Sequence, residues 1–341
     1  ALLAAGSVTV AGAQNTWSGG VTHVDTVFAP SLRGNLVGDP DRREVTVYLP
    51  PGYRQNRQKR YPVIYLLHGF AADHRAFVRG AYQNLNIRIS MDSLIRARKV
   101  KEMIVVTPSA RNFFDGSFYA NSPVTGRWED FIARDLVHHV DTKYRTSRGR
   151  QGRGIAGHSM GGFGALRVAM RNPDTFSAVY ALSPCCLGRM DARYLTAGWK
   201  AATRVTDRTS YSRSGFFANL LFALAALYSP DPSDPPLFAE LPYRLDGDSL
   251  APLPSVAEKW RATPLAMARS HLPALRRLSI AFDAGVSDLL TDIPVVVRSL
   301  DSLLTAEGIP HSAELYPGTH GGRFRLRLEE KALPFFSRTL R

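Results

Sequence analysis

The chain has 341 residues, of which 45% are hydrophobic and 21% charged, a balance that excludes disordered and fibrous proteins and allows a large buried core. No segment repeats at a fixed spacing and no apolar run is long enough to cross a bilayer, so we expect neither a solenoid nor a membrane span. The net charge of +14 is carried mostly by Arg residues that are scattered singly, which indicates a solvated basic surface, or attraction for an anionic substrate or envelope, rather than a nucleic-acid partner.

Two features of the sequence bear on where the protein works. Residues 1–13 resemble the end of a secretory signal peptide, because an apolar stretch closes in the small-x-small site Ala11-Gly12-Ala13. We therefore expect a secreted or periplasmic protein that begins near Gln14; the alternative is a frayed first strand. Cys185 and Cys186 are adjacent, so a bridge between them would be strained, and we expect two packed thiols.

Strand and helix patterns alternate along most of the chain. Alternating β-branched runs at 22–28 and 43–50 fit two antiparallel edge strands, and the unbroken apolar run 61–67 fits a strand buried on both faces. Further strands are predicted at 103–107, 154–157, 176–182, 278–282 and 312–316, and helices at 128–144, 160–170, 291–308 and from 325. The alternation predicts an α/β fold with a doubly wound, mostly parallel sheet.

The alternation fails in one long segment, residues 187–272. No strand pattern is found there, and we expect an inserted helical region that resembles a cap. The insertion would divide the core into a first part, residues 14–186, and a second part, residues 273–341.

One predicted helix of the insertion, residues 216–228, has a single polar residue, Asn219, among thirteen. It is too short to cross a bilayer, and a helix that is apolar on every face must be covered by protein or by ligand. Two interpretations stay open: an ordinary buried helix, or the wall of an acyl pocket. In the second, Phe217 and Leu221 would contact the substrate.

Ser159 stands in the pentapeptide Gly157-His158-Ser159-Met160-Gly161, between a short apolar strand and a helix. This is the context of a nucleophile elbow, a strained turn that needs Gly two positions before and after the Ser. The Ser159 hydroxyl would project at the top of the sheet, beside the positive end of the helix. We interpret Ser159 as a nucleophile and expect His158 near the substrate.

A serine hydroxyl needs a base to take its proton, and around such an elbow the base is the last of the three residues in the chain. His271, His311 and His320 are the histidines that follow Ser159. His320 comes directly after a terminal strand, where a loop can reach the elbow. His311 would lie at the opposite edge of the sheet and His271 in the insertion, so we expect His320 to be the base.

Three carboxylates are candidates for the acid that orients this base. Asp288 stands several residues beyond the strand that ends near Phe282, so a loop can carry it toward His320. Asp283 is still at the strand end and is the alternative, whereas Asp292 stands where it would cap the next helix. We expect Asp288 to complete a Ser-His-Asp triad.

Acyl transfer also needs donors for the oxyanion that forms on the carbonyl oxygen. One is expected from the N–H of Met160, directly after the nucleophile. The other is expected from Phe70, in the loop that follows the strand at 61–67, where Gly69 lets the backbone approach closely. We expect a structural role for the neighbouring His68. The chemistry calls for no metal and no cofactor.

These motifs together resemble the putative-esterase branch of the α/β-hydrolases, which includes esterase D/S-formylglutathione hydrolase, feruloyl esterases, enterochelin esterases and mycolyltransferases. The resemblance rests on Tyr61-Pro-Val-Ile-Tyr-Leu-Leu-His-Gly69, Trp128-Glu-Asp-Phe131, Asp141-Thr-Lys-Tyr-Arg145 and Ala156-Gly-His-Ser-Met-Gly-Gly-Phe-Gly-Ala-Leu166. It covers roughly residues 40–185 and 275–337 and implies the same triad. Two departures stand out: Gly321-Gly-Arg-Phe324 replaces a frequent Trp after the base, and the insertion has no counterpart.

The sequence therefore predicts a secreted serine carboxylic-ester hydrolase that works through an acyl-enzyme on a small-molecule, glycan-linked or lipid-linked ester. The alternative is an extracytoplasmic acyltransferase of the mycolyltransferase type, in which a sugar or lipid alcohol replaces water. A non-catalytic binding protein on a hydrolase scaffold is disfavoured because Ser159, Asp288 and His320 are all present.

Overall fold

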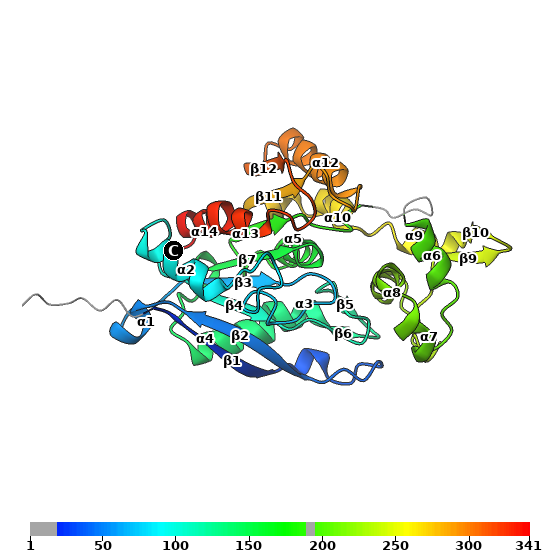
Figure 1. The fold of residues 1–341 in the computed structure, drawn as a ribbon, viewed down its shortest axis with the longest axis horizontal. Coiled ribbons are helices and arrows are strands. Elements are labelled where there is room, and N and C mark those ends of the chain that lie inside the picture. Colours follow the sequence, from blue (N-terminus) through cyan, green and yellow to red (C-terminus); the bar gives the residue numbers. More distant parts are fainter. Residues whose placement is uncertain (1–18, 189–194) are drawn as a thin grey trace, which may run out of the picture.

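The computed structural model describes residues 19–188 and 195–341. The expected end of a signal peptide, residues 1–13, lies outside them. None of the helices in the described ranges is both long enough and apolar enough to reach across a membrane. Figure 1 shows a central sheet flanked by helices, with the segment from α6 to α9 beyond one end of the sheet.

The central sheet has eight strands in the order β1-β2-β4-β3-β7-β8-β11-β12. Its strands are β1 Val21–Phe28, β2 Arg42–Leu49, β3 Val63–Leu67, β4 Ile104–Pro108, β7 Arg153–His158, β8 Ala178–Leu182, β11 Ser279–Gly285 and β12 His311–Tyr316. β2 runs antiparallel to both β1 and β4, and the remaining pairs are parallel. The predicted doubly wound, mostly parallel sheet with antiparallel strands at one edge is confirmed.

The central strands are apolar throughout because each is covered on both faces. In β3, Val63 and Tyr65 belong to one hydrophobic cluster, whereas Ile64 and Leu66 belong to the other. Consecutive side chains of a strand point to opposite faces, so an unbroken apolar run marks a strand between two layers. The helices that cover the sheet include α2 Ile87–Arg96, α5 Met160–Arg171, α12 Ile293–Ala306, α13 Phe324–Arg327 and α14 Leu333–Thr339.

The helix predicted at 128–144 is continuous but not uniform. It begins as α3 Trp128–Asp130, passes through π-helical turns at Phe131–Leu136 and ends as α4 Val137–Lys143. Similar π-helical turns, Leu328–Ala332, join α13 to α14. The remaining short elements of the core are the 3₁₀ turns Pro30–Leu32 and Arg150–Gly152, α1 Gly52–Gln55, β5 Asn121–Ser122 and β6 Gly126–Arg127.

The segment between β8 and β11 is mostly helical, but the expectation that it contains no strand was wrong. Its elements are α6 Thr196–Ala202, α7 Arg208–Arg213, α8 Phe216–Tyr228, β9 Tyr243–Asp246, β10 Ser249–Pro252, α9 Pro254–Lys259, α10 Pro264–Ser270 and α11 Leu272–Leu275. β9 and β10 form an antiparallel hairpin. Each strand has only four residues, too few to show an alternating pattern. The glycine at position 247, which adopts a φ of 58° in the turn, was the one local sign of the hairpin.

Helix α8 is apolar on every side because protein surrounds most of it. A Cβ built on Gly198 of α6 would lie 2.9 Å from Phe217 Cβ and 3.6 Å from a Leu221 methyl, so α6 packs closely against this part of α8. At its C-terminal end, the Ala226 carbonyl accepts a hydrogen bond of 2.6 Å from Ser122 Oγ in the core. The helix therefore lies between the core and the rest of the insertion (Figure 1).

A buried charge cluster joins the C-terminal ends of β11 and β12 to α13. Asp283 has no exposed surface; it accepts from Arg327 Nε at 2.9 Å and from the Tyr180 hydroxyl at 2.7 Å. Arg327 also holds Glu314 through two bonds of 2.8 Å. Burial raises the pKa of Asp283, and the Arg327 guanidinium opposes that rise. The Arg327 guanidinium thus balances the negative charge of a carboxylate that is shielded from water.

The variant Arg327→Met should lower the free energy of unfolding by about 3–5 kcal/mol, because it leaves the Asp283 carboxylate buried without its cation. Urea unfolding of the purified protein measures the change. Arg325→Met is the matched control, since Arg325 is half exposed and pairs with Glu329 at the surface; it should cost less than about 1 kcal/mol. Equal losses in the two variants would contradict this account of the cluster.

Candidate active site

Ser159 occupies the sharp turn between β7 and α5. Its φ of 56° is in the left-handed region, and its ψ is −117°, a conformation that L-residues adopt only when the surroundings enforce it. The backbone is held on both sides, because Ser159 N–H donates to Leu182 O at 3.0 Å and Ser159 O accepts from Phe163 N–H at 3.0 Å. The sequence thus folds into the nucleophile elbow that its pentapeptide predicts.

Both glycines of the pentapeptide are required by close backbone contacts. A Cβ on Gly157 would lie 2.3 Å from the Gly161 carbonyl, and a Cβ on Gly161 would lie 2.1 Å from Leu67 O. Neither distance is possible for a real side chain, since carbon and oxygen atoms touch at well over 3 Å. The elbow therefore brings the N-terminal end of α5 directly against the end of β3.

His320 and Asp288 lie in the loops after two neighbouring parallel strands, β12 and β11. Their side chains meet in a hydrogen bond of 2.8 Å between His320 Nδ1 and Asp288 Oδ2. The Asp288 carboxylate is fully buried, and its other oxygen accepts from Leu290 N–H at 2.9 Å. The carboxylate is therefore fixed, and it fixes one ring nitrogen of His320.

The loops that carry Asp288 and His320 are bonded to one another. Val286 N–H donates to Tyr316 O at 3.0 Å, and Ser287 N–H donates to Gly318 O at 2.9 Å. A Cβ on Gly285 would lie 2.3 Å from Gly318 O, so only glycine fits where the two loops separate from their strands. The short bond between the two side chains follows from this backbone contact.

The other candidates for acid and base have different partners. Asp283 belongs to the Arg327 cluster, and His311, at the start of β12, pairs with Asp301 at 2.8 Å. His271 contacts Met267 O at 2.9 Å through Nδ1. Asp292 stands at the N-terminal cap position of α12, but its side chain makes no capping hydrogen bond, so the expected capping role was wrong.

His158 lies beneath the His320 loop, whereas we expected it near the substrate. Its Nε2–H donates to His320 O at 2.8 Å, and the two imidazole rings are 4.8 Å apart. Burial lowers the pKa of His158 to about 3, so the ring is neutral and can be packed between Tyr82 and Phe324. Phe324 belongs to the segment that departs from the family pattern, and its ring supports His158 there.

The expected oxyanion loop follows β3 and touches the elbow. A Cβ on Gly69 would lie 3.6 Å from Ser159 Cβ. His68 holds this loop: its Nδ1–H donates to Gly69 O at 2.8 Å, and its Nε2 accepts from Ala110 N–H at 2.9 Å. Burial lowers the pKa of His68 to about 4, which keeps the ring neutral for these two bonds.

The N–H groups around Ser159 differ in their partners. Gly69 N–H donates to the Tyr82 hydroxyl at 2.8 Å. Across residues 19–188 and 195–341, neither Phe70 N–H nor Met160 N–H donates to a protein acceptor. Both are the amides predicted to bind an oxyanion, and both are available to do so.

Phe216, which the sequence analysis did not single out, lies beside this loop. Its ring is 5.3 Å from that of Phe70 in an edge-to-face arrangement, and the residue is 53% exposed. Of the two residues expected to contact the substrate, Leu221 is buried beside α6 and the Phe217 ring lies 5.4 Å from that of Phe216; their contact with substrate stays a prediction. Uniform hydrophobicity does not reveal which side of a helix faces a site, so Phe216 could not be distinguished from its neighbours by composition.

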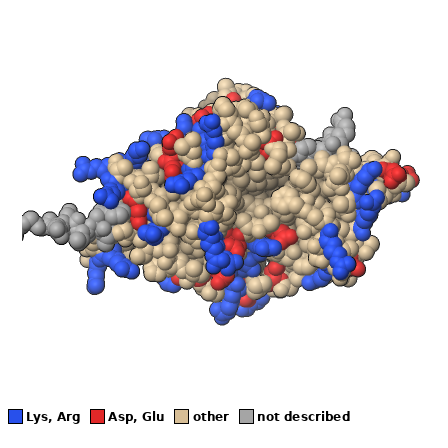
Figure 2. All heavy atoms as spheres, in the orientation of Figure 1, with Lys and Arg blue, Asp and Glu red and all other residues tan. Residues whose placement is uncertain are grey.

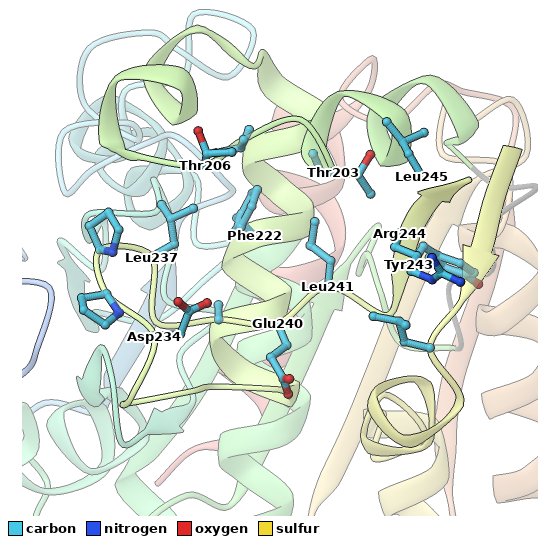
Figure 3. Close-up of a pocket in the computed structure, with 16 residues that line it drawn as sticks. Thr203, Thr206, Phe222, Asp234, Leu237, Glu240, Leu241, Tyr243, Arg244 and Leu245 are labelled. Carbon is cyan, nitrogen blue, oxygen red and sulfur yellow. The ribbon is translucent and has the colours of Figure 1, made fainter. Parts of the chain in front are cut away.

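A separate cavity of about 440 Å³ lies within the insertion. Figure 3 shows Phe222 of α8 and Leu237 and Leu241 of the following loop along its wall, with Asp234, Glu240 and Arg244 also lining it. Ser159, Asp288 and His320 do not line it.

On the face drawn in Figure 2, Lys and Arg lie mostly toward the margins, and an uncharged hollow lies near the centre.

The described residues contain no group of side chains arranged to bind a metal ion. The two cysteines of the chain are free thiols. In the part of the chain that the structure describes, no three His, Cys, Asp or Glu side chains form a cluster suited to a metal ion. Cys185 and Cys186 are buried and free, as predicted, with 3.1 Å between their sulfur atoms. The hydrogen bond from Cys186 to Cys185, together with burial, raises the pKa of Cys186, which keeps it protonated.

Among known proteins, the chain is similar to esterases. Among curated proteins, an endo-1,4-beta-xylanase/feruloyl esterase of Xylanibacter ruminicola is 32% identical over 139 residues, 38% of this chain and 18% of that protein. An esterase of Mycobacterium tuberculosis is 29% identical over 215 residues, 56% of this chain and 44% of that protein. The chain thus spans less than half the length of these two relatives.

Solved structures show the same fold over nearly the whole chain. A ferulic acid esterase is 25% identical with a TM-score of 0.63, and the match covers 94% of this chain and 99% of that one. An S-formylglutathione hydrolase of Staphylococcus aureus is 17% identical with a TM-score of 0.58, over 94% and 100% of the two chains. The model of the family described as "Putative esterase" matches residues 40–332. The chain therefore belongs to this esterase family, and its fold is that of an α/β-hydrolase.

Proposed function

We propose that the protein is an exported serine hydrolase of carboxylic esters that works through an acyl-enzyme. The observation that carries the proposal is the 2.8 Å bond between His320 Nδ1 and the buried Asp288 carboxylate, in loops at the same sheet edge as the Ser159 elbow. Family membership and the names of the esterases it resembles support ester hydrolysis. Export rests on the signal-peptide pattern at residues 1–13.

In the proposed acylation step, Ser159 Oγ attacks the ester carbonyl carbon while His320 Nε2 takes the hydroxyl proton. The carbonyl oxygen becomes an oxyanion and accepts from Phe70 N–H and Met160 N–H, which are free of protein acceptors among the described residues. The C–O bond to the alcohol then breaks, and His320 gives the proton to the leaving oxygen. Water attacks the acyl-enzyme by the same steps and releases the acid.

Asp288 serves this sequence by fixing the protonation of His320. Because the carboxylate accepts a hydrogen bond, the proton of the neutral ring stays on Nδ1, and Nε2 is left as the base. The same carboxylate stabilises the imidazolium that forms during each attack. His158 positions the loop from below by donating to His320 O at 2.8 Å.

Hydrolysis is favoured over transfer to a sugar or lipid alcohol. The transferase alternative depended on α8 as the wall of a long acyl pocket. Leu221 is completely buried beside α6, so it is part of the core, whereas Phe217 is partly buried and its ring lies 5.4 Å from that of Phe216. That argument for a water-excluding acyl site is therefore weakened.

We further propose that the insertion covers one side of the active site and contacts the substrate through Phe216. This ring is half exposed and packs edge-on against Phe70, whose N–H is the proposed oxyanion donor. An apolar or aromatic group close to the ester carbonyl could pack on it. The resemblance to a ferulic acid esterase supports an aromatic acyl group of this kind.

Ser159→Ala and His320→Ala should each reduce turnover of a chromogenic ester by about 10⁴-fold or more, because the triad acts as a unit. Asp288→Asn should cost more turnover than Asp283→Asn, since only Asp288 fixes the ring of His320. Steady-state kinetics on folded variants, with circular dichroism as the fold check, measures this. Retained activity in Ser159→Ala, or a severe loss in the control His311→Ala, would refute the assignment.

Phe216→Ala should lower kcat/KM for a hydroxycinnamoyl or other bulky apolar ester about tenfold relative to an acetyl ester, because roughly 50 Å² of lost apolar contact corresponds to about 1.3 kcal/mol. The matched control is Leu221→Ala in the same helix, because Leu221 is completely buried beside α6; it should reduce thermal stability and leave the ratio of the two substrates unchanged. An equal change of the ratio in the two variants, or no change in Phe216→Ala, would contradict the proposed contact.

A further inference from the structure

The loop after β4 lies between the two proposed oxyanion donors. Ala71 N–H, next to Phe70, donates to Asp115 O at 3.0 Å. A Cβ on Gly116 would lie 2.4 Å from Met160 Sδ and 2.7 Å from a Phe70 ring carbon. Gly116 is thus in contact with both residues whose amides would bind the oxyanion. A shift of this loop would disturb the packing of both side chains.

This loop holds a strained conformation. Asp115, Phe118 and Tyr119 have φ of 61°, 50° and 52°, values in the left-handed region that only a specific set of contacts can maintain. The Asn112 side chain accepts from Phe114 N–H and Gly116 N–H at 3.0 Å each. At the far end of the loop, the Tyr119 hydroxyl donates to His68 O at 2.9 Å.

The insertion reaches the same loop through the one polar residue of α8. Asn219 Nδ2 donates to Asp115 Oδ2 at 3.3 Å, and Asn219 Oδ1 accepts from Ser214 Oγ at 2.7 Å. The other Asp115 oxygen accepts from Arg111 at 2.7 Å. A hydrogen bond requires a particular direction between donor and acceptor, so these bonds orient the Asp115 and Asn219 side chains. The apolar contact between Phe216 and Phe70 imposes no such orientation.

We propose that Asn219 and Asp115 are positioning residues through which the insertion sets the geometry of the oxyanion donors. The chain of contacts runs from Asn219 to the Asp115 carboxylate, and from the Asp115 backbone to Ala71 beside Phe70. Gly116 extends it to Met160. The inference rests on the proposed function, since it takes Phe70 N–H and Met160 N–H as the donors.

This arrangement predicts a defect in transition-state binding rather than in substrate binding. Removing one oxyanion donor costs enzymes about 10²–10³ in kcat, so a displaced pair should cost less. Asn219→Ala should therefore lower kcat about tenfold and leave KM within about twofold. The Ki of a boronic acid, which forms a tetrahedral adduct with the nucleophile, should rise by the same factor, whereas inhibition by the carboxylic acid product should not change.

The matched control is Ser122→Ala. It removes the bond from Ser122 Oγ to Ala226 O, which joins the opposite end of α8 to the core. This variant should lose stability but keep kcat and the boronic acid Ki of the unaltered protein. A purely structural role of the insertion would instead make the two variants alike, with losses that follow their melting temperatures.

A charge exchange gives a rescue test. Asn219→Asp alone places two carboxylates together and should be more damaging than Asn219→Ala, whereas the double variant Asp115→Asn/Asn219→Asp restores one donor and one acceptor and should recover most of kcat. Unchanged kcat in a folded Asn219→Ala, or no recovery in the double variant, overturns the inference. If the unaltered protein hydrolyses no ester, or Ser159→Ala remains active, the proposed function fails and the inference fails with it.

Discussion

The site depends on backbone segments that approach one another without side chains between them. Gly161 lies against Leu67 O, Gly285 against Gly318 O, and Gly69 close to Ser159 Cβ. All of these contacts are at the carboxyl ends of parallel strands, where the loops of an α/β sheet converge. Any larger residue at the first two contacts would force strands or loops apart by an ångström or more. The short distance between Asp288 and His320 is a consequence of that crowding.

Asp283 and Asp288 are only five residues apart at the same edge of the sheet, but they pair with different kinds of residue. Asp283 is still on β11, where Arg327 and Tyr180 both donate to its Oδ2 atom. Asp288 is beyond the strand, where His320 and Leu290 N–H bond its oxygens. A guanidinium keeps its proton at any ordinary pH, whereas an imidazole exchanges one near neutrality. The first pair joins β11 to α13, and the second is the one proposed to take part in proton transfer.

Much of this arrangement could be predicted from the sequence, because its signals are local. The sheet follows from apolar runs and alternation, and the elbow from glycines at fixed spacing around Ser159. The pairing of Asp288 with His320 follows from chain order and from the place of each loop after its strand. The catalytic roles themselves remain predictions.

Features that depend on tertiary contacts could not be predicted in this way. A helix as apolar as α8 has no face that marks the site, so nothing in the sequence distinguished Phe217 and Leu221 from Phe216, which is the most exposed of the three. His158 was expected near the substrate, and the structure shows its side chain bonded to the backbone of the His320 loop. Only the position of Phe324 and Tyr82 in space reveals why a neutral, buried imidazole is tolerated there.

Helix α8 gives the insertion a role that its composition alone conceals. Its buried side chains fix it between core and α6, its C-terminal end is bonded to Ser122, and its N-terminal end carries both Phe216 and Asn219 to the loops around the elbow. Phe216 packs on Phe70, and Asn219 bonds the loop that contacts Phe70 and Met160. If the proposed roles of these residues hold, one helix links substrate contact to oxyanion geometry, and a change in how α8 packs would alter both together.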